Sequence, residues 1–234
     1  MRHLILVLEG PLLAFGGETV DAHGVIADFP AASLLTGLLA NALGWRRSER
    51  TALDRLQARL RFAARIDREG RRFTDYQTAH LFEDEKGWTT RGAVEARAKS
   101  PSYQREKSGR RALTHQRWRD YDADKRVTVA LRLDPAEEAP TVDDLAAALS
   151  TPARPLFLGR KPCLPSRPVL ESVVEAADFL AALPPAEAPA RLLLPDAEPA
   201  AEHDERRPIS DQRNWRSGVH GGQRMVRIRR VEPG

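Results

Sequence analysis

The sequence predicts an α+β fold, a sheet with helices on one face, of which the ferredoxin-like fold is the common case. Three observations predict it: an apolar strand at the N-terminus, helical periodicity soon after it, and a clearly alternating strand followed by a helix in mid-chain. With 234 residues, 41% of them hydrophobic, the chain is long enough for one large domain or two small ones with a substantial core. We therefore expect residues 1–234 to form a globular protein.

The first two elements have distinct patterns. Residues 3–8 (HLILVL) are apolar on both faces and end at Gly10-Pro11, which indicates a central strand of a sheet. Leucines then recur at helical spacing from Ser33 to Leu43, and Gly44 stands where a glycine commonly ends a helix. The other face of this helix carries small residues four apart, which would let another backbone approach closely: Ser33, Gly37 and Asn41.

A second helix is expected from Ser48, as N-cap, to about Ala58, with Leu53 and Leu56 directed inward. Residues 60–67 and 71–79 flank a turn at Arg68-Glu69-Gly70. Two extended segments around such a turn predict a β-hairpin.

The second half of the chain has fewer strong signals. Residues 126–133 alternate as a strand, and Thr141 with Asp144 forms a variant of the capping box that opens a helix to about Leu149. Residues 184–208 contain six prolines among Ala and Glu and predict a flexible or extended segment. In the C-terminal part, 209–234, a basic strand is expected at about 224–231.

Charge is unevenly distributed. Residues 91–126 hold eleven Lys/Arg against five acids, and residues 206–230 hold eight Arg against one Asp. Residues 134–205 between them hold fourteen acids against five bases. Two basic blocks predict a polyanion-binding surface assembled from distant segments, with the acidic stretch elsewhere. The alternative is that an arginine-rich composition merely produces solvated faces.

Several classes of function lose support. The six histidines and the single cysteine lack metal-ligand spacing, and the glycines lack the dinucleotide and P-loop patterns, so no metal and no cofactor are expected. Cys163 is expected to pack in the interior. The N-terminus does not have the features of a signal peptide, and no apolar run spans a bilayer. We expect a cytoplasmic protein without membrane contact.

The richest cluster lies at 110–126 and interleaves cations with rings, as binding of single-stranded RNA requires. The ring residues Trp118 and Tyr121 could equally be core residues before the next strand. The segment from about 78 to 117 is long, basic and without sustained periodicity, and it predicts a protruding insertion. The cations and rings of the cluster are Arg110, Arg111, His115, Arg117, Trp118, Arg119 and Tyr121.

The same cluster permits a second interpretation. His115, Tyr121 and Lys125 supply the groups of a metal-independent ribonuclease, in which a base deprotonates the 2′-hydroxyl and a cation stabilises the phosphate. The sequence alone cannot show these three side chains converging. A single His in a basic segment more often contacts phosphate or base, so catalysis is the lesser alternative.

Two further basic sites are expected. In LGRKPCLPSRPV, Arg160 and Lys161 follow Gly159 in a loop braced by prolines, which suits a phosphate or a protein partner. In the strand at 224–231, Arg227 and Arg229 share one face, and we expect them to form a phosphate track.

These motifs together resemble the CasD family of the RAMP superfamily. The resemblance rests on GPLLAFG, FPAASLLTGLLANALGW, DYQTAH, WRDY before TVAL, and PLFLGRKPC, in this order over about residues 1–170. Two positions depart from the family pattern: Ala32 stands where a basic residue is common, and Leu34 where glycine is common. The segment after residue 184 matches the family poorly.

The resemblance implies a modified ferredoxin-like (RRM-like) body, a single RAMP domain, with a β-hairpin thumb within 78–117. It implies a non-catalytic subunit that binds the 5′ handle of CRISPR RNA in the type I-E Cascade complex, an antiviral ribonucleoprotein. The implied partners are CRISPR RNA, the backbone subunit and the large subunit, with target DNA reached indirectly. A related subunit in another CRISPR subtype cleaves precursor RNA, which keeps the endoribonuclease alternative open. A purely structural assembly role is a third alternative.

The resulting RNA-contact candidates combine the basic cluster, the family motifs and the C-terminal strand. They are Ser33, Asn41, Arg46, Tyr76, Arg110, Arg111, His115, Arg117, Trp118, Arg119, Arg160, Lys161, Arg227 and Arg229.

Overall fold

The computed structural model describes residues 1–17, 22–82, 87–88, 94–95 and 104–233. The helices are α1 (Ala32–Ala42), α2 (Arg50–Arg59), α3 (Val142–Ser150) and α4 (Phe179–Ala182). The strands are β1 (Arg2–Glu9), β2 (Leu12–Leu13), β3 (His23–Gly24), β4 (Leu60–Arg68), β5 (Arg71–Phe82), β6 (Gly87–Trp88), β7 (Val94–Glu95), β8 (Gln104–Arg105), β9 (Arg111–Ala123), β10 (Arg126–Leu133), β11 (Leu170–Glu175), β12 (Ala190–Pro195), β13 (Glu205–Ile209) and β14 (Arg224–Val231).

The main sheet has seven strands in the order β11-β1-β10-β4-β12-β14-β13, and every neighbouring pair is antiparallel. β1 lies between β10 and β11, which confirms the predicted central strand. Its residues Leu4 to Leu8 are all at most 2% exposed, because both faces of the sheet are covered. The mixed α/β architecture follows from this apolar sheet and its coverings.

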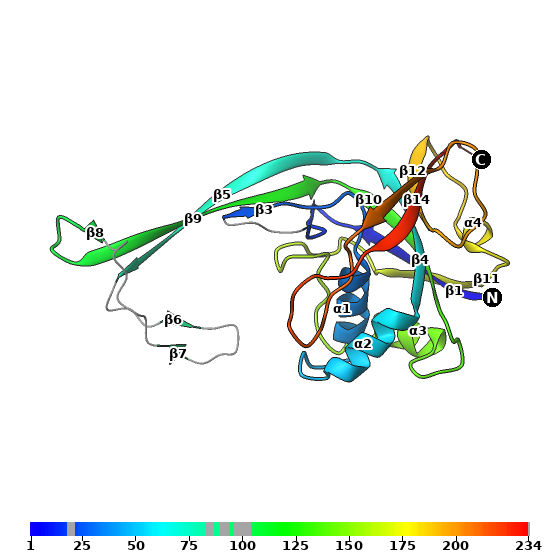
Figure 1. The fold of residues 1–234 in the computed structure, drawn as a ribbon, viewed down its shortest axis with the longest axis horizontal. Helices are drawn as coiled ribbons and strands as arrows, with labels where there is room; N and C mark the ends of the chain where they lie inside the picture. The colour runs from blue at the N-terminus through cyan, green and yellow to red at the C-terminus, as the bar shows by residue number, and fades with distance from the viewer. Residues whose placement is uncertain (18–21, 83–86, 89–93, 96–103, 234) are drawn as a thin grey trace.

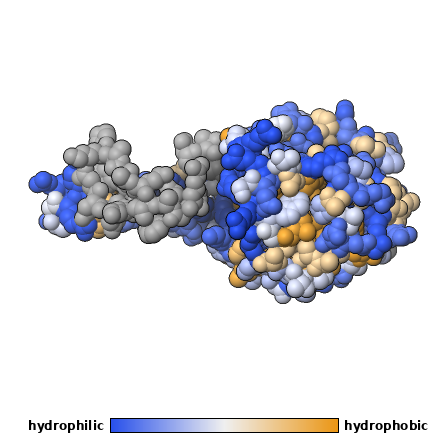
Figure 2. Space-filling view, turned by 90° about the horizontal axis from the view of Figure 1, so that it is seen from below, coloured by the Kyte–Doolittle hydropathy of each residue, from blue (hydrophilic) through white to orange (hydrophobic). Residues whose placement is uncertain are grey.

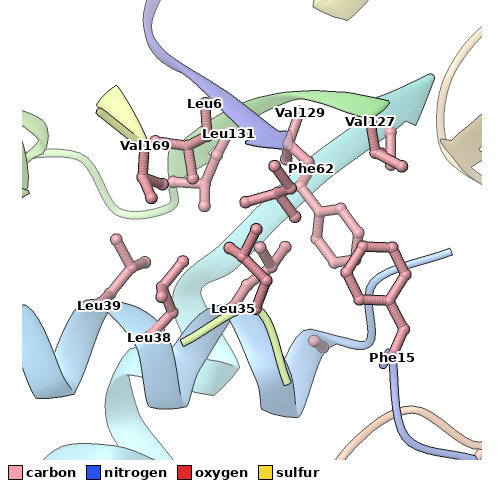
Figure 3. Packing of buried hydrophobic residues seen from close by; sticks show 14 of the residues in the cluster. Leu6, Phe15, Leu35, Leu38, Leu39, Phe62, Val127, Val129, Leu131 and Val169 are labelled. Carbon is pink, nitrogen blue, oxygen red and sulfur yellow. The ribbon is translucent and has the colours of Figure 1, made fainter. Parts of the chain in front are cut away.

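The larger core lies between the sheet and α1, α2 and α3 (Figure 1). Figure 3 shows the leucines of α1 facing side chains of β1, β4 and β10, and Phe15 and Phe62 belong to the same buried cluster. The opposite face is covered by α4, whose Phe179 is fully buried against residues of β1, β4, β10 and β12. The expectation of helices on a single face is therefore wrong for α4, because apolar side chains on the second face also require a cover.

The helix ends follow the sequence in two of three cases. α1 ends at Leu43 and Gly44, whose φ of +79° is the left-handed conformation that favours glycine. α3 begins with the predicted capping box, in which Thr141 and Asp144 bond each other's backbone N–H groups. The predicted N-cap of α2 is wrong: the cap is Glu49, without a side-chain bond to the helix, and its carboxylate instead accepts from the backbone N–H of Arg46.

The predicted hairpin of residues 60–67 with 71–79 is also wrong. The chain does turn at Gly70, but β4 pairs with β10 and β12, whereas β5 pairs with β9 over twelve consecutive residue pairs. Most of β4 is buried in the sheet, with Leu60, Phe62, Ala64 and Ile66 in the larger core and Ala63 beneath α4, whereas β5 has a polar, exposed sequence. The turn therefore joins two different sheets.

β5 and β9 form a long two-stranded ribbon, here called the arm, that projects from the body (Figure 1). β2 and β3 pair with β9 near the body, and β8 pairs with the far end of β9. The basic insertion expected at 78–117 thus includes the outer arm, although much of it falls on residues outside those the structure describes. Both chain ends lie on the side of the body away from the arm (Figure 1).

The base of the arm is held by a chain of ion pairs. Asp122 of β9 accepts from Lys125 at 2.9 Å and from Arg72 of β5 at 2.9 Å. Arg72 and Arg191 of β12 both bind Asp28, at 2.9 and 3.0 Å. Because Asp122 and Lys125 are 3% and 1% exposed, this pair lies in the interior and its separation would be costly.

The segment at 184–208 differs from its prediction. It contains β12, which is largely buried in the main sheet, and most of β13 at the sheet edge. Pro189 and Pro195 lie at the ends of β12, Pro208 lies in the edge strand β13, and the other three prolines lie in the connecting segments, so none interrupts the interior of a strand ladder. The apolar run of Leu192 to Leu194 was masked in the sequence by the surrounding Pro, Ala and Glu. No helix among the described residues is both long and apolar enough to cross a membrane.

Candidate nucleic-acid interface

An open pocket of about 460 Å³ lies where α1, the turn at Gly159 and Arg160, and the segment between β13 and β14 meet. That segment passes beside α1 and α2 (Figure 1). The lining of the pocket combines small, apolar, basic and ring residues: Ala14, Gly16, Ala31, Ser33, Leu34, Gly37, Leu38, Asn41, Phe157, Gly159, Arg160, Arg213, Trp215 and His220.

The small-residue face of α1 forms one wall of the pocket. A Cβ on Gly37 would stand 3.8 Å from the Trp215 ring, an ordinary van der Waals distance, so this ring lies directly against the small-residue face. The backbone N–H of Ser33 donates to Asp211 at 2.9 Å, and Asn41 Nδ2 donates to the Pro155 carbonyl at 2.7 Å. The close approach predicted for this face is therefore made by the chain's own C-terminal segment.

The turn at Gly159 is fixed against the body. Its φ is +111°, and a Cβ there would stand 1.9 Å from the carbonyl oxygen of Ala14, so only glycine fits. Arg160 donates at 2.7 Å to the Asp120 carbonyl and at 2.6 Å to the Gly24 carbonyl, and its guanidinium lies 5.0 Å from the centroid of the Tyr121 ring. Arg160 therefore joins the pocket to the base of the arm.

Two neighbours of Arg160 have different environments. Lys161 is exposed and directed to solvent. Cys163 is fully buried, and burial raises the pKa of its thiol, as expected for a packing residue.

The register of the arm separates its side chains into two faces. Tyr121, Arg119, Arg117 and His115 alternate along one face of β9. Because the pocket residue Arg160 stacks on Tyr121, this cationic face lies on the side of the pocket. Arg117 is exposed, and its guanidinium donates to the adjacent Gln116 carbonyl, whereas Arg119 donates to Gln77 of β5 at 3.0 Å. Arg160, which lines the pocket and lies on Tyr121, therefore connects the pocket to the base of this face.

Three rings gather on the other face of the arm. Trp118 stacks on His23 of β3 with centroids 4.9 Å apart and planes 8° from parallel. Tyr76 of β5, which is 52% exposed, lies 5.2 Å from Trp118 on its other side. Tyr76 and Trp118 thus form part of an accessible ring platform, and Tyr121, by contrast, is a buried residue at the arm base.

The remaining basic candidates are dispersed. Arg46 is exposed between α1 and α2 and does not line the pocket. Arg110 and Arg111 lie at the start of β9, far along the arm, where the Arg110 guanidinium is 3.6 Å from the centroid of Phe82. The structure therefore brings together Ser33, Asn41 and Arg160, and separately the residues of the arm.

The catalytic arrangement considered for His115, Tyr121 and Lys125 does not form. His115 and Tyr121 share a face of β9 but are six residues, roughly 20 Å, apart along the strand. Tyr121 is 4% exposed and packs against Phe73, and Lys125 is buried on Asp122. These three groups cannot act on one phosphate.

The expected phosphate track of Arg227 and Arg229 is also wrong. Arg229 binds the Asp204 carboxylate with two bonds of 2.8 Å, and Arg227 lies 3.4 Å from Asp196 and bonds the Glu198 carbonyl. The acidic stretch was expected to lie away from the basic surface, but its carboxylates neutralise arginines of the C-terminal basic strand. Since β13 and the preceding turn pair with β14, the opposite charges are brought side by side.

A family-model comparison decides the relationship of this chain. Residues 3–227 match the model described as CRISPR-associated protein (Cas_Cas5). The chain belongs to the Cas5 family. It is 29% identical over 176 residues, 75% of this chain and 73% of the relative, to the CRISPR system Cascade subunit CasD of Escherichia coli (strain K12).

Solved structures agree with this family assignment. A chain of a CRISPR RNA-guided surveillance complex has a TM-score of 0.65 and 25% identity, and the alignment covers 99% of this Cas5-family chain and 90% of that chain. A structure titled crystal structure of Cas protein has a TM-score of 0.62 and 24% identity, covering 99% and 95%. The family match extends through β12, β13 and half of β14. The expectation of a poor match to the family after residue 184 is therefore wrong.

The sequence analysis missed four residues at the surface of this Cas5-family chain. Arg213, Trp215 and His220 line the pocket, and His23 completes the ring platform. Arg213 and Trp215 belong to a basic block that was noted, and the Trp between two arginines in RNWR was the available signal. His23 carried no signal, because only its pairing with β9 places it beside Trp118.

The Asp204–Arg229 pair predicts a pH dependence of stability. The bonds from Arg229 lower the pKa of Asp204 from 3.8 to about 2, so the pair stabilises the fold fully above pH 3.8 and loses this contribution as the pH falls toward 2. We expect Asp204→Asn to cost about 1–2 kcal/mol at pH 7 and progressively less below pH 4. Urea unfolding of both proteins at pH 7, 5 and 2.5 measures this, and a difference as large at pH 2.5 as at pH 7 would contradict it.

Proposed function

We propose that this Cas5-family chain is the non-catalytic RNA-binding subunit of a Cascade complex and that it binds the 5′ handle of CRISPR RNA. The observation that supports this most is the continuity of the pocket with the cationic face of the arm through Arg160. Single-stranded RNA needs cations along its backbone and small, ring-lined sites for unstacked bases, and this surface offers both. The kinship with a Cascade subunit supports the assembly.

We also infer that the body is a single RAMP domain with a modified ferredoxin-like core. β1, β4, β10 and β11 have the spatial order β11-β1-β10-β4, and α1 with α2 follows β1 as α3 follows β10. This βαββαβ order supports the proposal. In it, the arm corresponds to the thumb, and the backbone subunit and large subunit of the complex are the protein partners.

The RNA path has two parts in this proposal. The backbone follows Arg117 and Arg119 toward the pocket wall at Ser33, Asn41 and Arg160. A base displaced past the edge of the ribbon stacks on Tyr76, since β5 forms the outer edge of the arm. Lys161, Arg46, Arg110 and Arg111 contribute longer-range attraction.

Handle-dependent binding tests the proposal. Fluorescence anisotropy with the purified chain, alone and with its partner subunits, should show tighter binding of RNA carrying the repeat-derived 5′ handle than of the same RNA with a scrambled handle. The affinity should fall steeply with salt, because counterion release dominates phosphate contacts. Equal affinity for both RNAs would refute handle recognition, and metal-independent cleavage of precursor RNA by the purified chain would refute the non-catalytic role.

Tyr76→Ala should weaken binding of the handle RNA by about 1–3 kcal/mol, the value of one base–aromatic stack. Tyr76→Phe is the matched control and should bind as the wild type does, because it keeps the ring. Equal losses in both variants would show that the hydroxyl, not stacking, matters. Loss in neither would remove Tyr76 from the RNA path.

A further inference from the structure

Two arginine side chains converge beside Gly218 without a carboxylate between them. Their Nη2 atoms stand 3.1 Å (Arg47) and 3.3 Å (Arg213) from the position of a Cβ on Gly218. Within the described part of the chain, neither guanidinium group forms a salt bridge. By contrast, Arg224 and Arg229 of the same C-terminal block each bind a carboxylate directly, that of Asp211 and that of Asp204.

The convergence carries an electrostatic cost. Arg213 Nε is buried and has no hydrogen-bond partner. Burial, and then the charge of Arg47, lowers the pKa of Arg213. Like charges and an unpaired buried donor destabilise the folded chain, so an anion held here would gain charge-assisted hydrogen bonds from both groups.

Hydrogen bonds hold the backbone around these two arginines in place. Gln57 of α2 bonds both backbone groups of Arg213, accepting from its N–H at 3.1 Å and donating to its carbonyl at 3.0 Å. Asn214 Oδ1 accepts from the N–H groups of Arg216 and Ser217, and the Gly218 N–H donates to the Asn214 carbonyl. Gly218 has a φ of +77°, a backbone conformation that favours glycine. Because glycine has no side chain, the space between the two guanidinium groups stays open.

The surroundings favour a nucleic-acid phosphate over a protein carboxylate. Trp215 lies beneath Arg213, 5.6 Å from its guanidinium, and together with His220 lines the adjoining pocket, which gives rings next to the cations. Arg46, Arg50 and Arg216 are exposed on the same side, around the α1–α2 turn. Figure 2, which views the helical side, shows hydrophilic residues gathered where the body meets the arm. A row of cations suits a polyanion.

We propose that Arg47, Arg213 and the turn at Gly218 form a seat for one phosphodiester of single-stranded RNA. This inference rests on the proposed function and extends the RNA path beyond the pocket, along the segment between β13 and β14 to the α1–α2 turn. The nucleotide attached to this phosphate lies with its base toward Trp215 and His220. Neither Arg47 nor Arg213 belongs to the residues expected from the sequence.

Salt-dependent anisotropy with labelled handle RNA tests the seat. Arg47→Ala should weaken binding by about 3- to 10-fold, and Arg47→Ala with Arg213→Ala by about 10- to 30-fold, as loss of charge-assisted bonds to one phosphate implies. The slope of log K against log salt should become shallower by about 0.7 in the double variant, the value for one phosphate of a single strand. Arg230→Ala removes the same charge from an exposed site near the C-terminus and should change neither quantity.

The outcomes separate the seat from the function it rests on. Wild-type protein that binds no RNA overturns both. If the wild type binds RNA and the double variant has the same affinity and the same salt slope, the seat alone is overturned. If that double variant also fails to bind a protein partner, an acidic protein, and not RNA, occupies the site. Thermal unfolding should show that no variant is less stable than the wild type, because neither side chain has a carboxylate partner among the described residues and the substitutions remove the repulsion between the two guanidinium groups. Arg47→Ala alone provides the result if the double variant folds poorly.

Discussion

Asp122→Ala is expected to destabilise the protein by about 3–5 kcal/mol, the largest effect of any single substitution at the arm. The change leaves the ammonium group of Lys125, which is 1% exposed, without its carboxylate and removes the bond from Arg72. An uncompensated charge in the interior costs more than the pair contributes. Chemical denaturation measures the loss, and hydrogen exchange should show it concentrated in β5 and β9 near the body.

Asp120→Ala is the matched control, since Asp120 lies two residues away on the same face of β9 but is only partly buried and bonds the Thr74 hydroxyl. We expect a cost of less than about 1 kcal/mol. Asp122→Leu combined with Lys125→Met should recover much of the stability, because it removes both charges. Equal effects of Asp122→Ala and Asp120→Ala would show that the buried pair does not hold the arm.

Reversing two charges on the cationic face, with Arg117→Glu and Arg119→Glu, should weaken handle RNA binding by roughly 100-fold or more. The substitutions remove two phosphate contacts and add repulsion beside the pocket. Among the described residues, Arg117 bonds its neighbouring carbonyl and Arg119 bonds Gln77 across the ribbon, and neither has a carboxylate partner there, so the fold should change little. Anisotropy against salt concentration measures the affinity and the number of phosphates released.

The control reverses two other charges, with Arg2→Glu and Arg230→Glu. Both residues are near the chain ends, which lie on the side of the body away from the arm (Figure 1). Arg2 has only an exposed ion pair with Asp143, which contributes little to stability. The control should bind RNA within a few-fold of the wild type. A comparable loss in both double variants would mean that net charge, and not the arm, sets the affinity.

The sequence predicted best where one segment determines its own structure. The leucines of α1 and Gly44 define a helix and its end, and the capping box of α3 needs only Thr141 and Asp144, three residues apart. The same holds for the small face of α1, whose Ser33 and Asn41 do reach the pocket. These features depend on neighbours in the chain, so the periodicity and spacing of residues contain them.

The sequence by itself therefore determined the α+β class, β1, β10, β14, α1 and α3, and a concentration of cations with rings in β9. Only the tertiary structure decided which strand pairs with which and which charges remain free. β4 pairs with β10 and β12, and not with β5, because its apolar side chains required burial in the main sheet. Arg229 was neutralised because folding brought Asp204 beside it. Burial and ion pairing depend on residues distant in sequence. For the same reason Arg47 and Arg213, 166 positions apart, become a candidate phosphate site only once α2 holds the C-terminal turn.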